Sequence, residues 1–243
     1  MGRAARPVCI IGPMKQMALA LARPPAPDFD SYASGRNAEA LAAMRAIAAA
    51  RETERMIYLW GAPGSGKSHL LHATANAATR RVAWFPVQPA DVADALVLVD
   101  DVERLDAEAQ RLLFNVYNEV RDNGGCLVVA GAAPPPGLAL RDDLVTRLSW
   151  GLVLQLHALT DDEKIAALER HAHGRGLKLP GEVSAYLLRH GQRDLPSLIG
   201  ILDALDRHCL ETQRPVTLPL LREVLQTRLH LEDVPDPFPT GTP

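Results

Sequence analysis

Gly61-Ala62-Pro63-Gly64-Ser65-Gly66-Lys67-Ser68 fits the phosphate-binding pattern G-x-x-x-x-G-K-[ST] at every fixed position. In this pattern the glycines let backbone N–H groups turn inward around a β-phosphate, and the lysine reaches the β and γ oxygens. The serine hydroxyl is a ligand for Mg²⁺. The motif therefore predicts a site for ADP or ATP with Mg²⁺. The residues expected to contact the nucleotide are Gly61, Pro63, Gly64, Ser65, Gly66, Lys67, Ser68 and His69.

The sequence on both sides of this loop supports the same interpretation. Residues 56–60 are apolar and predict a buried strand that enters the loop. Residues 67–79 are rich in Ala, Leu and His and contain no Gly or Pro, so they predict a helix whose N-terminus faces the anion. A glycine-rich surface turn is the alternative, and the order of strand, loop and helix argues against it.

A second motif follows at residues 96–101, where four apolar residues run into Asp100 and Asp101. The apolar run predicts a central strand whose C-terminal end places Asp100 beside the phosphate loop, where it can hold Mg²⁺ together with Ser68. Asp101 is then the residue nearest the attacking water. The alternative is an Asp pair that caps a helix after an ordinary strand.

Strands and helices alternate through the first part of the chain and then give way to helices alone. We predict strands at 56–60, 82–87, 95–99, 126–130 and 152–156, which implies an α/β domain with a five-stranded parallel sheet at residues 31–158. Helical segments at 161–175, 180–190, 195–213 and 218–229 predict a small all-helical domain at 159–230. Residues 1–30 and the acidic, proline-rich residues 231–243 are expected to be flexible tails.

The composition excludes several classes of protein. A net charge of −3, from 26 basic and 29 acidic side chains, gives no general attraction to nucleic acid. Three widely spaced cysteines without a C-x-x-C pair indicate neither disulfides nor a zinc site, so we expect a cytoplasmic protein. No apolar run reaches the roughly 18 residues of a membrane span. The apolar run at 17–22 is too short for a signal peptide, and Met14 is an alternative start.

Together these motifs resemble the AAA+ nucleotide-binding module and, within it, the DnaA-related family that contains the initiator DnaA and the regulator Hda. Residues 29–37 are similar to the family's F-x-x-[FY]-x-x-G-x-N segment, which implies that Asn37 lies near the adenine. Residues 142–151 look like its L-x-S-R-[FL]-x-W-G segment, which implies that Arg147 is an arginine finger. Residues 192–195 resemble the R-E-L segment of the lid and place Arg193 as the second sensor.

The resemblance covers about residues 14–226 and implies roles for the two arginines. Arg147 would reach, in trans, the γ-phosphate of ATP on a neighbouring molecule, where such a finger raises turnover roughly 10³- to 10⁵-fold. Arg193 would contact the chain's own nucleotide. For both residues the alternative is a solvated surface cation.

The N-terminal tail carries a further resemblance. Residues 16–21 are similar to the Q-x-x-L-x-L peptide by which Hda and other replication proteins dock on the sliding clamp, the β subunit of DNA polymerase III. Gln16 would fill a polar subsite, and Leu19 and Leu21 an apolar groove. The clamp would then bring the protein to DNA indirectly. A helix start is the alternative for these residues.

Departures from the family pattern argue against two functions, ATP hydrolysis in cis and initiation of replication. Residues 129–134 contain no Asp, Asn, Ser or Thr where AAA+ proteins place the first sensor, so we expect weak or no ATP hydrolysis in cis. Residues 88–94 leave no room for the helical insertion that DnaA uses on single-stranded DNA, and no helix-turn-helix or basic run follows Leu229.

The sequence thus predicts an Hda-like negative regulator of replication initiation that activates hydrolysis of ATP on DnaA. A homodimer is compatible with this interpretation. The alternatives are a self-sufficient AAA+ ATPase, such as a DnaC-type helicase loader, and a structural clamp adaptor.

Overall fold

The computed structural model describes residues 26–190 and 194–232. Five parallel strands form one sheet in the order β2-β3-β4-β1-β5. Their bounds are β1 Met56–Trp60, β2 Val82–Trp84, β3 Leu96–Val99, β4 Cys126–Gly131 and β5 Leu152–Gln155. The predicted α/β fold with a five-stranded parallel sheet is therefore confirmed.

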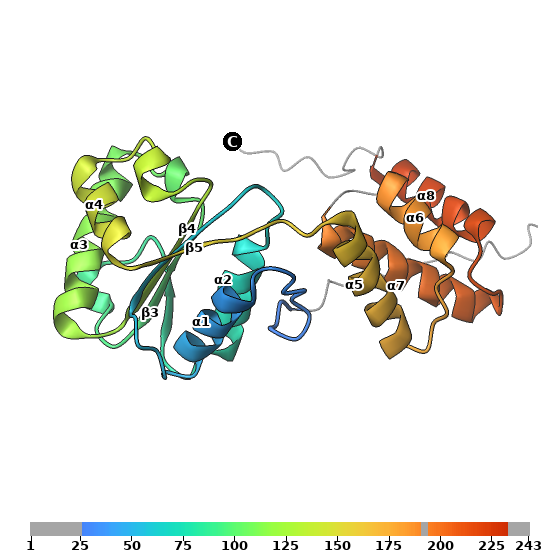
Figure 1. Ribbon diagram of the computed structural model, residues 1–243, viewed down its shortest axis with the longest axis horizontal. Coiled ribbons are helices and arrows are strands. Elements are labelled where there is room, and N and C mark those ends of the chain that lie inside the picture. The colour runs from blue at the N-terminus through green and yellow to red at the C-terminus, as the bar shows by residue number, and fades with distance from the viewer. Residues whose placement is uncertain (1–25, 191–193, 233–243) are drawn as a thin grey trace, which may run out of the picture.

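Helices cover both faces of the sheet and make a three-layer domain, as Figure 1 shows, with α1 and α2 on one face and α3 and α4 on the other. The helices and short 3-10 turns of this domain are α1 Ala38–Ala48, α2 Lys67–Ala77, η1 Pro89–Asp91, η2 Val102–Arg104, α3 Ala107–Asn123, η3 Pro135–Gly137 and α4 Asp142–Trp150. Alternate strand residues serve the two cores: Ile57 and Leu59 pack under α1 and α2, and Tyr58 packs under α3 and α4. Burial on both faces explains the continuous apolar runs of β3 and β4.

Several elements begin or end one to three residues from the predicted bounds, and one helix was not predicted. Strand β2 ends at Trp84 instead of residue 87, because Pro86 has no N–H to donate to the ladder. Helix α4 was not predicted as an element, although Leu144 and Leu148 lie one turn apart and are both buried.

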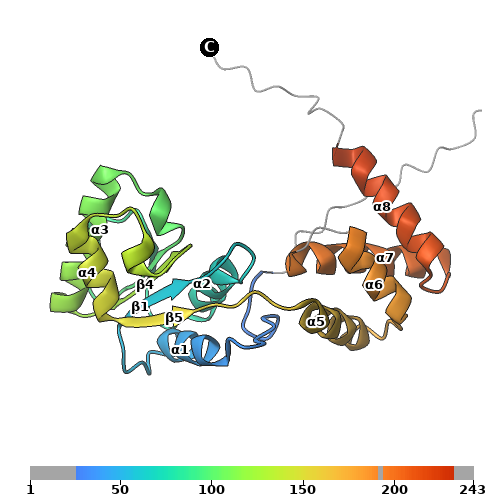
Figure 2. The same cartoon turned by 45° about the horizontal axis from the view of Figure 1, so that its top comes forward.

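The second domain consists of helices around their own apolar core. They are α5 Asp161–Gly174, α6 Gly181–His190, α7 Leu195–Thr212 and α8 Leu218–Glu232. Figure 2 shows α8 lying over α6 and α7, and a short connection from β5 to α5 joins the two domains. Within the described ranges, no helix has the length and apolarity needed to cross a membrane.

A capping box fixes the first turn of α5. The hydroxyl of Thr160 accepts a hydrogen bond from the N–H of Glu163 at 3.3 Å, and the carboxylate of Glu163 accepts one from the N–H of Thr160 at 2.8 Å. The helical domain therefore begins abruptly, after a connection of five residues from β5.

A half-buried ion pair ties two loops to the first residue of β4, where the strands begin. The Arg80 guanidinium contacts Glu52 Oε1 at 2.5 Å and Cys126 Sγ at 2.9 Å, and the thiol donates to the same carboxylate at 3.0 Å. Burial, helped by Glu52, raises the pKa of the Cys126 thiol to about 12. Burial alone would raise the pKa of Glu52, but the bonds from Cys126 and Arg80 outweigh it and hold that pKa below its usual value.

We predict that Arg80→Ala lowers the free energy of unfolding by about 2–4 kcal/mol, because it leaves the Glu52 carboxylate buried without its counter-ion. Arg121→Ala, which removes an exposed ion pair with Asp122, should have a clearly smaller effect because solvent screens that pair. Urea denaturation at pH 7 measures both. Since the folded pKa of Glu52 is depressed, its contribution is present at neutral pH and is lost as the pH falls through that folded pKa. Equal effects of the two substitutions would contradict the prediction.

Candidate nucleotide-binding site

The phosphate loop follows β1 and is pressed against neighbouring backbone. The N–H of Gly61 donates to Gly131 O at 3.3 Å, which joins the loop to the end of β4. A Cβ atom on Gly61 would lie 2.3 Å from the carbonyl oxygen of Leu156. Gly64 and Gly66 have φ values of 76° and 94°, in the region that favours glycine. The loop therefore needs glycine at 61, 64 and 66, the first for space and the others for backbone conformation.

Lys67 and Ser65 supply polar groups inside the loop. Lys67 is 8% exposed, and its ammonium donates to Gly61 O at 2.7 Å and to Ala62 O at 3.3 Å. The hydroxyl of Ser65 is buried and has no hydrogen-bond partner in the described part of the chain. A buried hydroxyl without a partner is costly, and a phosphate oxygen would satisfy it. These groups, with Ser68 exposed in the first turn of α2, fit a nucleotide phosphate and its Mg²⁺.

The two aspartates after β3 differ in their surroundings. Asp100 accepts the N–H of Asp101 at 3.0 Å and lies at the sheet edge where the phosphate loop begins. Asp101 has a φ of 47°, and its carboxylate pairs with Arg104 at 3.3 Å. The role of Asp100 with Mg²⁺ stays a prediction, whereas Asp101 is engaged in an ion pair.

Two side chains hold the loop that follows β4, where the sequence lacks a polar sensor. Ala132 N–H donates to Glu103 Oε2 at 3.2 Å, and the Tyr58 hydroxyl donates to Ala133 O at 2.7 Å. Burial, with a smaller effect of Glu103, raises the pKa of Tyr58, so the phenol stays protonated and donates. Hydrogen bonds from other segments thus fix the backbone of this loop, although the side chains of Ala132 and Ala133 cannot form hydrogen bonds themselves.

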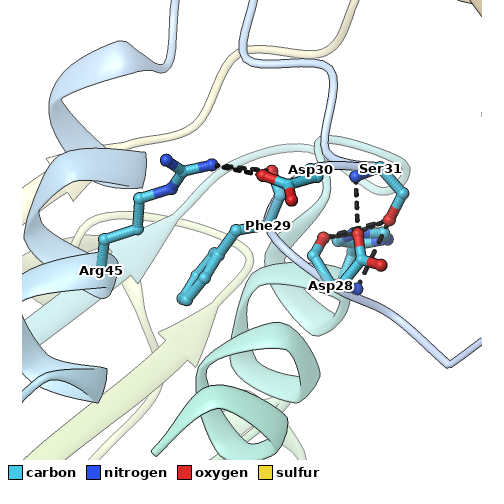
Figure 3. Close-up of polar contacts among 6 residues, drawn as sticks. Asp28, Phe29, Asp30, Ser31 and Arg45 are labelled. Atoms are coloured by element: carbon cyan, nitrogen blue, oxygen red, sulfur yellow. Dashed lines mark hydrogen bonds and ion pairs between the residues drawn. The ribbon is translucent and has the colours of Figure 1, made fainter.

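Residues 28–31 are fastened across α1 and α2, as Figure 3 shows. Ser31 N–H donates to Asp28 Oδ1 at 2.6 Å, and bonds from Ser31 hold the pKa of Asp28 below its usual value. His69 Nε2 lies 3.0 Å from Asp28 O. Arg45 pairs with Asp30 at 3.0 Å and lies over the ring of Phe29. The imidazole of His69 therefore contacts the backbone of residues 28–31 and helps to hold this segment on α2.

Tyr32 and Asn37 continue this segment to the edge of the phosphate loop. A Cβ on Gly66 would lie 2.7 Å from the Tyr32 ring, so the ring rests directly on the loop. Asn37 is 3% exposed; its amide donates to His157 O at 2.8 Å and to the Tyr32 hydroxyl at 3.2 Å, and it accepts from His157 N–H at 2.8 Å. Asn37 thus clamps the segment to the chain leaving β5, and its contact with the adenine stays a prediction.

Arg147 lies at the other edge of the sheet. Its side chain lines a small cavity with Met56, Ile57 and Leu127, at the beginning of β1 and β4. A Cβ on Gly151, directly after α4, would lie 2.2 Å from Met56 O. Since β1 is five residues long, roughly 13 Å of strand separates this edge from the phosphate loop. Arg147 therefore does not share a site with Lys67 of its own chain.

Solved structures with this fold include replication proteins. Domain III of the initiator DnaA from Thermotoga maritima aligns over 82% of this chain and 95% of that one, with a TM-score of 0.66 and 22% identity. AMPPCP-bound DnaA from Aquifex aeolicus aligns over 86% of this chain and 70% of that one, with a TM-score of 0.64 and 21% identity. RuvB from Thermotoga maritima aligns over 83% and 72%, with a TM-score of 0.61 and 15% identity.

Residues 161–225, which cover most of the helical domain, match the family model described as "Hda, lid domain". The four helices from α5 to α8 therefore resemble the lid domain of Hda, which confirms the predicted resemblance over this part of the chain.

The site brings together most of the residues predicted to bind nucleotide. The phosphate loop, His69 and Asp100 gather at one sheet edge, while Arg147 stands apart. Arg193, Gln16, Leu19 and Leu21 lie outside the described residues. The sequence reasoning missed Tyr32, Tyr58 and Glu103 as site residues. Glu103 follows the acidic pair by only two residues, which is the signal that could have identified it.

We predict that Lys67→Ala weakens ADP and ATP binding roughly 10- to 100-fold, since it removes charge-assisted hydrogen bonds to phosphate. Titration with a fluorescent nucleotide measures the change. The matched control is Lys178→Ala, which removes an exposed lysine of the lid and should leave affinity unchanged. Unaltered affinity in Lys67→Ala would show that the loop does not bind phosphate.

Proposed function

We propose that this chain is an Hda-like negative regulator of replication initiation. It holds ADP or ATP at the phosphate loop, docks on the polymerase sliding clamp, and uses Arg147 to stimulate hydrolysis of ATP bound to DnaA. The observation that carries the proposal is the placement of Arg147 at the sheet edge away from its own phosphate loop. In this proposal the protein works in the cytoplasm.

Arg147 is suited to contact a second molecule because no carboxylate forms an ion pair with its guanidinium. No acidic side chain forms an ion pair with it among residues 26–190 and 194–226. Asp143, on the same helix as Arg147, forms an ion pair with Arg141 instead, with Nη2 and Oδ2 2.7 Å apart. A free guanidinium can place two N–H donors on phosphate oxygens and stabilise the charge that develops there. A half-buried arginine in the last turn of α4 without a carboxylate partner thus has the chemistry of a finger in trans.

The nucleotide bound to this chain would act mainly by setting the conformation of the phosphate loop and of the segments that contact it. Mg²⁺, when bound, supplies charge neutralisation between the β- and γ-phosphates. Lys67 and the loop N–H groups bind the phosphates, and Ser68 and Asp100 are the candidate metal ligands. Ser65, Tyr32 and Leu156 then link the filled loop to the N-terminal segment and to the chain entering the lid.

Features of the site support weak hydrolysis in cis. Asp101 is paired with Arg104, and the loop after β4 presents Ala132 and Ala133 where a polar sensor would orient water. The connection between β2 and β3 contains the short turn η1 and no longer helix, which argues against an initiator-type insertion. These features favour an activator of another protein's ATPase over a helicase loader.

We predict that Arg147→Ala lowers stimulation of DnaA-bound ATP hydrolysis roughly 10³-fold, the lower end of the effect of a trans arginine finger. The assay contains DnaA, ATP, clamp and DNA. Arg141→Ala is the matched control, because Arg141 is paired within its own helix, and it should retain stimulation within about twofold. If Arg147→Ala stimulates fully, the proposed mechanism is wrong.

The clamp contact is tested separately. We expect Gln16→Ala to reduce retention on immobilised clamp at least about tenfold, because the amide would leave a polar subsite of the groove unfilled. Gln88→Ala, an exposed glutamine at the start of η1, is the matched control and should bind like the wild type. Equal retention of all three proteins would remove the clamp from the proposal.

A further inference from the structure

Arg147 is held by aromatic rings from two helices. Its guanidinium carbon lies 4.4 Å from the ring centre of Trp150, three residues later on α4. It also lies 5.6 Å from the ring centre of Phe114 and 5.9 Å from that of Tyr117, both on α3. All three distances fall within the range of about 6 Å for cation–π attraction. The shortest contact is made by the most exposed ring, since Trp150 is 62% exposed.

This kind of contact leaves the hydrogen-bonding edge of the guanidinium open. A cation–π contact uses the flat face of the group, whereas its five N–H donors point outward in the plane. A carboxylate partner would instead occupy those donors in a bidentate pair. That is the situation of Arg141 with Asp143, where two bonds of 3.1 and 2.7 Å engage the fork.

The position of Trp150 fits this function better than a role in the core. Residues three apart on a helix lie on the same side, so the indole can cover the arginine from its own helix. The apolar core beneath α4 is filled by Leu144 and Leu148, which are buried. An indole left this exposed contributes little to packing, and its close contact is the guanidinium.

We propose that Trp150 is a positioning residue for the arginine finger. Its ring, backed by Phe114 and Tyr117, holds the face of the Arg147 guanidinium and restricts the side chain's rotamers. The N–H donors stay available for the phosphate oxygens of a nucleotide on the partner AAA+ protein. The inference rests on the proposed function, and it adds that the finger is pre-oriented before the partner binds.

The kinetic test compares Trp150→Leu and Trp150→Phe in the DnaA-bound ATP assay. Leu removes the aromatic face, so the maximal stimulated rate should fall roughly five- to tenfold, with half-maximal stimulation at an unchanged protein concentration. Phe keeps a ring and should restore most of the rate. Trp84→Leu is the matched control, since Trp84 is 38% exposed and stacks on His72 instead of Arg147.

A readout without DnaA makes the stacking itself measurable. The side-chain protons of Arg147 should show upfield ring-current shifts in the NMR spectrum of the full chain. These shifts should largely disappear in Trp150→Leu and persist in Trp150→Phe and Trp84→Leu. Circular dichroism confirms that each variant is folded.

The outcomes separate this inference from the proposed function. Full stimulation by Arg147→Ala overturns the proposed function, and with it any finger for Trp150 to orient. Loss in Arg147→Ala with a wild-type rate in Trp150→Leu overturns only the inference. A raised half-maximal concentration at an unchanged maximal rate also overturns it, because Trp150 would then be a docking residue. Unchanged Arg147 shifts in Trp150→Leu would show that the stack is absent.

Discussion

The close approach of Gly61 to the carbonyl of Leu156 constrains the whole arrangement. No side chain fits between them, and the hydrogen bond from Leu156 N–H to Trp60 O, 2.6 Å long, holds the two chains in register. The phosphate loop and the chain that leads to the lid are therefore neighbours through their backbones. A change in loop conformation would therefore act directly on the chain that leads to the lid, without an intervening side chain that could absorb it.

Because all five strands run in the same direction, the parallel sheet places the candidate nucleotide site at one end and Arg147 at the other. The carboxyl ends of the strands present the phosphate loop, Asp100 and the clamped loop after β4. Their amino ends face Arg147 and the half-buried pair of Arg80 and Glu52. A molecule with binding groups at one edge and a cation at the other is suited to meet a second such molecule head to tail.

The sequence predicts the features that depend on local pattern. The phosphate loop has fixed spacing, and fully buried strands leave unbroken apolar runs, so both are recognisable in single segments. Contacts between distant segments leave no such trace. Asn37 and His157 are 120 residues apart, and nothing in either segment names the other as its partner. The aromatic surroundings of Arg147 likewise depend on how α3 packs beside α4, which spacing within α4 does not reveal.

The capping box at Thr160 and Glu163 marks the point where the lid begins. Asn37 fixes His157 on one side and the box fixes Thr160 on the other, so Ala158 and Leu159 form the short connection about which a lid movement would pivot. The 14 residues of α5 form a lever roughly 21 Å long, so a turn of about 10° at this pivot displaces its far end by about 4 Å. A small adjustment of the chain beside the phosphate loop would thus become a larger displacement at the remote end of the lid.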